Sequence, residues 1–116
     1  MTSLVDRITR VTEPNLPIHE FVFDLRMWAR GITTQADIQA RYGLVASDFT
    51  AGGDMKFLID AYNAVVGETK RRFFMEDIKQ LLLALEADTL DTRALRTKSV
   101  FTATVRALRD SANAIV

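Results

Sequence analysis

The sequence predicts an all-α fold, a compact bundle of four to six helices with a short N-terminal arm. Two observations lead to this prediction. Apolar residues recur at spacings of three and four along most of the 116 residues, which is the period of a helix. Beyond residue 16, no run of five residues alternates between apolar and polar types with turn signals on both sides, as a strand would. We expect an arm over residues 1–16 and a single helical domain over residues 17–116.

The N-terminal arm ends at a break that contains both prolines of the chain, Pro14 and Pro17. The arm is rich in Val, Ile and Thr, so a helix and an extended segment compete in it. Because the prolines separate the arm from the body, we predict that it reaches a neighbouring subunit. Its candidate contact residues are all apolar: Leu4, Val5, Ile8 and Val11.

The first helix of the body is predicted from Pro17 to just before Gly31, because proline suits the first helical position and glycine suits the residue after the last. Its apolar stripe comprises Ile18, Phe21, Val22, Leu25, Trp28 and Ala29. Phe23 and Met27 are four residues apart and lie off this stripe. They either widen the core or form an exposed patch for a partner helix or for self-association.

A short helix is predicted over residues 34–41, where Thr34 caps the start and Gly43 follows the end. This helix and the segment after it invite comparison with the helix-turn-helix of DNA-binding proteins. The second helix of such a motif would contain Gly52 and Gly53, at a cost of roughly 2 kcal/mol relative to alanine. We therefore expect a loop at these glycines, and not a helix that reads bases.

Three further helices complete the predicted fold. The first begins at Asp54 and ends at Gly67, and its apolar stripe is Met55, Leu58, Ile59, Tyr62, Val65 and Val66. The second follows Thr69 and runs to about Ala87, with a stripe of Phe74, Ile78, Leu81, Leu82 and Leu85 that Phe73 and Leu83 widen. The third is capped by Ser99, and its stripe is Phe101, Val105, Leu108, Ala112 and Ile115.

The composition excludes several classes of protein. Without cysteine there is no disulfide scaffold, no zinc finger and no thiol catalysis. The longest apolar run, residues 81–85, is far shorter than the ~20 residues of a membrane span. The first residues lack a basic region followed by an apolar core, so no signal peptide is expected. We expect no membrane partner.

Side chains that could perform chemistry are few. His19, the only histidine, could act as a neutral base near a helix start, but no serine or cysteine nucleophile forms a recognised motif with it. Glu20 and Asp24 lie one turn apart, as carboxylates on solvated helix faces often do. The stretch 52–54 precedes a helix but lacks the spacing of a phosphate-binding loop. We predict no catalytic residue, no cofactor, no metal site and no small-molecule substrate.

Basic residues gather in two clusters, which together we call the basic strip. The first cluster is Lys70, Arg71 and Arg72, and the second is Arg93, Arg96, Lys98, Arg106 and Arg109. No acidic residue lies between Thr92 and Arg109. The strip could contact nucleic acid or an acidic protein surface, or it could form ion pairs on a solvated face. The whole chain balances 15 basic against 15 acidic residues, which does not favour a nucleic-acid partner.

Several segments resemble those of small all-helical proteins encoded among the structural genes of tailed bacteriophages. They are residues 23–34, 42–44, 60–64 and 70–85, together with Asp48. The resemblance spans about residues 20–87 and implies a role in the virion or its assembly, at the capsid, the connector or the tail. It implies no active site and assigns no functional residue.

Two functions follow as predictions. The first is a non-enzymatic structural or assembly protein that acts through protein contacts in a homo-oligomer or a larger assembly, as a virion component. The alternative is a small nucleic-acid-binding or regulatory protein that uses the basic strip. The expected location is the virion if the phage resemblance holds, and the cytoplasm otherwise.

Overall fold

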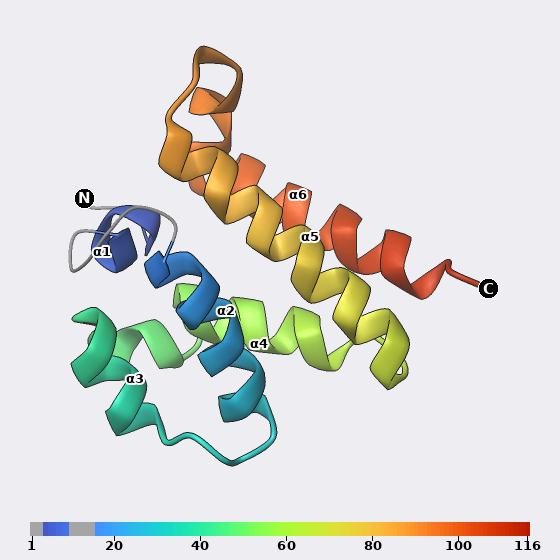
Figure 1. The fold of residues 1–116 in the computed structure, drawn as a ribbon. Coiled ribbons are helices and arrows are strands. Elements are labelled where there is room, and N and C mark those ends of the chain that lie inside the picture. Colours follow the sequence, from blue (N-terminus) through green and yellow to red (C-terminus); the bar gives the residue numbers. More distant parts are fainter. Residues whose placement is uncertain (1–3, 10–15) are drawn as a thin grey trace. The chain divides into compact units, whose positions relative to one another are not determined.

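A computed structural model describes residues 4–9 and 16–116 of the chain. Within these ranges the chain forms helices and no strand, which confirms the predicted all-α fold (Figure 1). The elements, in chain order, are α1 (Leu4–Thr9), α2 (Leu16–Ala29), α3 (Gln35–Tyr42), the 3₁₀ helix η1 (Ala46–Phe49), α4 (Asp54–Asn63), α5 (Glu68–Ala87), the 3₁₀ helix η2 (Leu90–Arg96) and α6 (Lys98–Asn113).

The chain divides into two compact units, and the boundary between Ile59 and Asp60 lies inside α4. The first unit contains α1, α2, α3, η1 and the first part of α4. The second contains the end of α4 together with α5, η2 and α6. The expected division into an arm over residues 1–16 and a domain over 17–116 remains a prediction.

In the first unit, α1 packs against α2. Residues 4–9 form a helix and not an extended segment. Leu4, Val5 and Ile8 of this helix are buried. The largest fully buried side chains of this unit are Ile8, Ile18, Phe21, Leu25, Ile38, Met55 and Leu58. Trp28, at the end of the α2 stripe, is half-buried and lies edge-on to Phe49 of η1, with ring centroids 5.1 Å apart.

The end of α2 is a Schellman turn, in which two successive amides bond back to carbonyls of the last helical turn. The amide of Gly31 donates to the carbonyl of Trp28, and the amide of Ile32 to the carbonyl of Met27, both at 2.9 Å. Gly31 has a φ of +76°, a conformation that a residue with a Cβ adopts only at a cost. The glycine that the sequence marked as the end of this helix is thus required by its backbone.

Helix α3 lies between the predicted flanking residues, Thr34 and Gly43, and extends one residue past the predicted end, to Tyr42. The hydroxyl of Thr34 accepts a hydrogen bond from the amide of Asp37 at 3.2 Å, which caps the helix start. Gly43 ends the helix with a φ of +64°. Leu44 then folds back and is buried.

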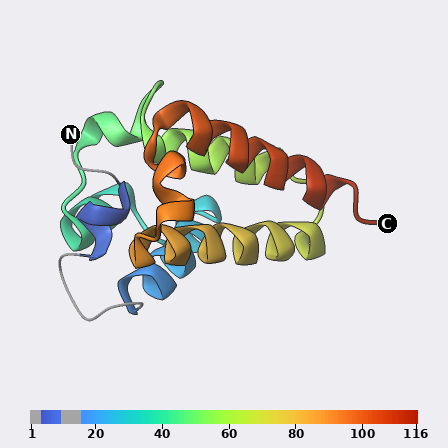
Figure 2. The ribbon, with the colours of Figure 1, turned by 90° about the horizontal axis from the view of Figure 1, so that it is seen from above.

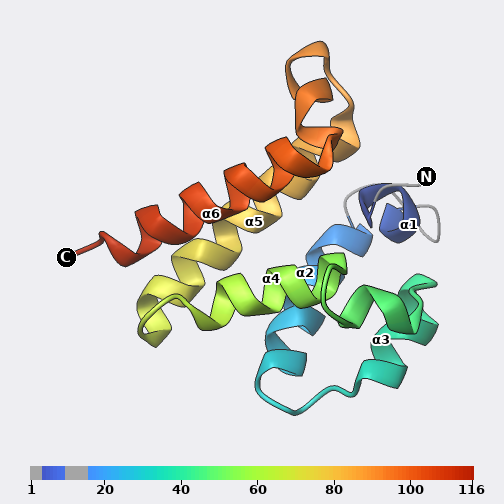
Figure 3. The same cartoon turned by 180° about the vertical axis from the view of Figure 1, so that it is seen from behind.

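The segment between α3 and α4 contains a single four-residue turn, η1, and not a recognition helix (Figure 3). Gly52 has a φ of +87°. A Cβ on Gly53 would lie 2.4 Å from the carbonyl oxygens of Ser47 and Asp48, which is closer than real side chains approach. The two glycines therefore permit a turn and a close backbone approach, respectively. The carbonyl oxygens of Ser47 and Asp48 beside Gly53 are partly negative, so they also oppose the binding of a phosphate or another anion there.

In the second unit, α5 and α6 pack against each other in opposite directions (Figure 1). Seen from above, η2 lies at the end where α5 stops and α6 starts, and it contacts both helices (Figure 2). Most buried residues of the two helices lie on the predicted stripes: Phe74, Ile78, Leu81, Leu82, Leu85, Val105 and Ala112. Met75 is also buried, although the predicted stripe did not include it.

Four details of the second unit differ from expectation. Ile115 is exposed, because α6 ends at Asn113 and no longer places it on the stripe. Val66 is exposed, because α4 ends at Asn63 and the helical period no longer places its side chain. Phe73 is exposed, because it lies about 100° around α5 from Phe74, on the side away from the buried Met75 and Leu82. Helix α6 begins before Ser99, with Thr97 in the cap position.

Candidate functional site

The predicted interface residues fall into two groups. Leu4, Val5 and Ile8 are buried where α1 packs on α2, whereas Val11 lies outside the described residues. Phe23 is 59% exposed and Met27 is half-buried. The part of the predicted interface that faces outward is therefore on α2.

Phe23 and Met27 belong to a longer outward surface, which we call the α2 strip and define as Glu20, Phe23, Met27, Arg30 and Ile32. Glu20 and Arg30 are exposed on either side of the two apolar residues. Ile32 is 67% exposed. It belongs to the strip because the Schellman turn holds its amide against the carbonyl of Met27. Two apolar residues, Phe23 and Met27, thus lie between an acidic residue, Glu20, on the N-terminal side and a basic residue, Arg30, just after the helix.

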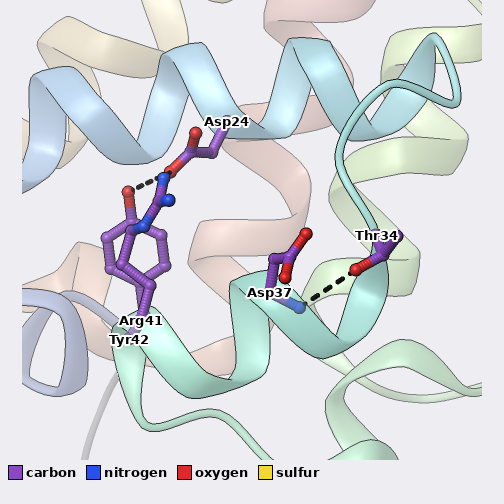
Figure 4. Close-up of polar contacts among 5 residues, drawn as sticks. All are labelled: Asp24, Thr34, Asp37, Arg41 and Tyr42. Carbon is purple, nitrogen blue, oxygen red and sulfur yellow. Dashed lines mark hydrogen bonds and ion pairs between the residues drawn. The ribbon is translucent and has the colours of Figure 1, made fainter.

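A network of polar side chains fixes α3 to α2 (Figure 4). Asp24 is only 5% exposed, and one of its carboxylate oxygens, Oδ2, accepts two short hydrogen bonds. One comes from Nη1 of Arg41 and one from the hydroxyl of Tyr42, each at 2.6 Å. The Tyr42 ring meets Phe21 edge-on, with centroids 5.4 Å apart. The helix that carries the α2 strip is therefore braced by both polar and aromatic contacts.

The electrostatics of this network favour the protonated forms of both donors. Burial, followed by the hydrogen bond to the Asp24 carboxylate, raises the pKa of Tyr42 above its ordinary value of 10.0. The hydrogen bond to Asp24, followed by the charge of that carboxylate, raises the pKa of Arg41. A phenol that holds its proton this firmly is a poor base and a poor nucleophile near neutral pH. The two hydrogen bonds to Asp24 thus brace α3 against α2.

The sequence interpretation missed this network, since it placed Asp24 with Glu20 on a solvated face. A signal was present, because Asp24 directly precedes Leu25 of the apolar stripe and follows Phe21 by three residues. A carboxylate at the edge of a buried stripe needs donors, and it finds them in α3.

The first basic cluster lies where the ends of α4 and α6 meet the start of α5. Nε of Arg71 donates to the carbonyl of Val65 at 2.8 Å, and Nη2 of the same side chain donates to the carbonyl of Asn63 at 3.3 Å. The Arg71 guanidinium also lies over the Tyr62 ring, 5.2 Å from its centroid. Nζ of Lys70 donates to the backbone carbonyl of Asn113 at 3.3 Å. These cations bond carbonyls that helix ends leave without intrahelical partners.

The side chain of Asn113 completes this junction. Its Oδ1 accepts from the amide of Val66 at 2.9 Å, and its Nδ2 donates to the carbonyl of Ala64 at 3.1 Å. Three successive carbonyls at the end of α4, those of residues 63–65, are therefore bonded by side chains of α5 and α6.

The second basic cluster is more divided. Arg96 of η2 donates to the carbonyl of Leu85 and lies 3.3 Å from the carboxylate of Asp88, so it binds the end of α5. Nε of Arg109 lies 3.1 Å from the carboxylate of Asp110. Three residues of this cluster are exposed: Arg93, Lys98 and Arg106. In the first cluster, Arg72 is exposed and lies 3.9 Å from Glu68.

The remaining chemical candidates can be placed briefly. His19 is exposed on α2. Over residues 4–9 and 16–116, no group of three His, Cys, Asp or Glu residues is arranged to hold a metal ion. None of the helices described is both long and apolar enough to cross a membrane.

Comparison with protein-family models, curated proteins and solved structures found no match to this chain.

Proposed function

We propose that this chain is a structural or assembly protein that acts through protein contacts in an oligomer. The observation that supports this function best is the α2 strip, where Phe23 is exposed on a braced helix and Ile32 is exposed just after that helix ends. Exposing such side chains to water costs free energy that burial in an interface recovers, at about 25 cal/mol per Å² of apolar area. The sequence resemblance supports the tailed-phage virion as the setting of this oligomer.

Binding of nucleic acid through the basic strip remains the alternative. The contacts of Lys70, Arg71 and Arg96 weigh against it, because each of these side chains bonds a backbone carbonyl near the end of a helix. A phosphate contact would have to compete with these bonds. A titration of DNA binding at low salt, where phosphate contacts are strongest, tests this alternative.

Sedimentation equilibrium over a range of protein concentrations tests the proposed function. The wild-type mass should rise above the 13.1 kDa of one chain, and Phe23→Asp should reduce that rise. Phe73→Asp is the matched control, because Phe73 is an exposed phenylalanine on a helix of the other unit. The proposal would be contradicted if the chain stays monomeric at every concentration and is missing from purified phage particles.

A further inference from the structure

We infer that the α2 strip pairs with the same strip of a second copy of this chain, with the two α2 helices antiparallel. This inference rests on the proposed function and specifies its partner and geometry. It follows from the order of charged and apolar residues along α2 and from the face on which they lie.

The strip is self-complementary when one copy is reversed. Suppose that a two-fold axis relates the two helices at the level of residue 25. Each residue of one copy then lies opposite a residue of the other copy, and the two residue numbers add up to 50. Phe23 of one copy then lies opposite Met27 of the other, and Glu20 opposite Arg30. A two-fold interface forms every such contact twice, so two apolar contacts flank the axis and an ion pair of opposite charges closes each end.

The angular positions on the helix agree with this axis. At about 100° per residue, Glu20, Phe23, Met27 and Arg30 all fall within a sector of about 80°. The centre of that sector is diametrically opposite Leu25, which is 1% exposed. A single outward face, opposite the buried one, therefore carries both charges and both apolar residues. A parallel pairing would instead bring Glu20 against Glu20 and Arg30 against Arg30.

The size of the strip sets the expected strength of pairing. Helix α2 has 14 residues and a length of about 21 Å. One such helix offers less area than the roughly 800 Å² per partner of a standard stable interface. The two-fold pairing should therefore be weak and dependent on concentration in dilute solution. Such a contact gains strength when a larger assembly holds many copies together.

Charge reversal tests the register directly. Glu20→Arg alone should place like charges at both ends of the interface, and Arg30→Glu alone should do the same. The two-fold axis forms each contact twice, so a single substitution turns two attractive charge pairs into two repulsive pairs. Because these pairs are exposed, each single variant should weaken self-association about threefold to tenfold. The double variant Glu20→Arg/Arg30→Glu restores opposite charges and should recover most of the wild-type affinity. Asp77→Arg, at an exposed site on α5, is the control and should change little.

The outcomes of sedimentation equilibrium separate the two proposals. If the wild-type chain self-associates and the double variant fails to recover, the antiparallel pairing is wrong while the proposed function stands. If the wild-type chain is strictly monomeric and missing from particles, both are wrong. Circular dichroism and the urea midpoint of each variant establish that the variants fold. Recovery in the double variant, with both single variants weakened, is the expected result.

Discussion

A double-mutant cycle on the network around Asp24 tests whether burial or formal charge determines its strength. The two donors are equally close to the carboxylate, at 2.6 Å each, but they differ in exposure. Tyr42 is 2% exposed, whereas the Arg41 side chain is 53% exposed. Water can replace the arginine contact but cannot reach the phenol, so we expect Tyr42 to contribute more even though Arg41 carries the charge.

The expected magnitudes follow from these environments. Asp24→Ala leaves the buried Tyr42 hydroxyl without its acceptor, which should cost about 1–3 kcal/mol of unfolding free energy. Hydrogen bonds to charged groups contribute about 1.5–3 kcal/mol, so the coupling between Asp24→Ala and Tyr42→Phe should fall in that range. The coupling between Asp24→Ala and Arg41→Ala should be smaller, because solvent screens the exposed guanidinium.

Urea unfolding, monitored by circular dichroism at pH 7, measures both couplings. Asp77→Ala removes an exposed carboxylate from α5 and should change stability by less than about 0.5 kcal/mol. An Asp24–Arg41 coupling that equals or exceeds the Asp24–Tyr42 coupling would refute the reasoning, because formal charge would then outweigh burial.

Two further predictions concern pH and the capping arginine. The raised pKa of Tyr42 keeps its phenol neutral in the folded chain, whereas the unfolded chain loses that proton as the pH rises through 10. The contribution of Tyr42 to the free energy of unfolding is therefore full below pH 10 and declines above it. In urea unfolding, the stability gap between wild type and Tyr42→Phe should narrow by about 1.4 kcal/mol between pH 9 and pH 11, and a constant gap would oppose this. Arg71→Ala should cost about 1–2 kcal/mol through its two lost carbonyl bonds, whereas Arg72→Ala should cost less than about 0.5 kcal/mol. Equal losses at the two neighbouring arginines would contradict the capping role.

Features set by neighbouring residues were predictable from the sequence. Gly31 and Gly43 end α2 and α3 because their backbones adopt positive φ values, and Thr34 caps α3 through an amide three residues away. The apolar stripes were predictable for a similar reason, since the helical period links each residue to those three and four positions on. Val66 departs from its stripe because α4 ends before it.

Features set by distant partners were not predictable in this way. Asp24 finds its donors 17 and 18 residues along the chain, so spacing within α2 could show only that a carboxylate lies beside the stripe. Lys70 reaches the backbone of Asn113 across 43 residues. Only the structure shows that Arg71 faces the end of α4 and that Lys70 faces the end of α6. The exposure of Phe23 likewise depended on how the whole unit folds.

Disulfide trapping measures the pairing of α2 most directly, because the natural chain has no cysteine to compete. Chains with Glu20→Cys are mixed with chains with Arg30→Cys, oxidised mildly, and resolved by mass spectrometry. Antiparallel pairing brings these two positions together, so the disulfide between the two different chains should exceed either disulfide between identical chains. An excess of disulfides between identical chains, or no trapping at concentrations where the wild-type chain self-associates, would contradict that pairing.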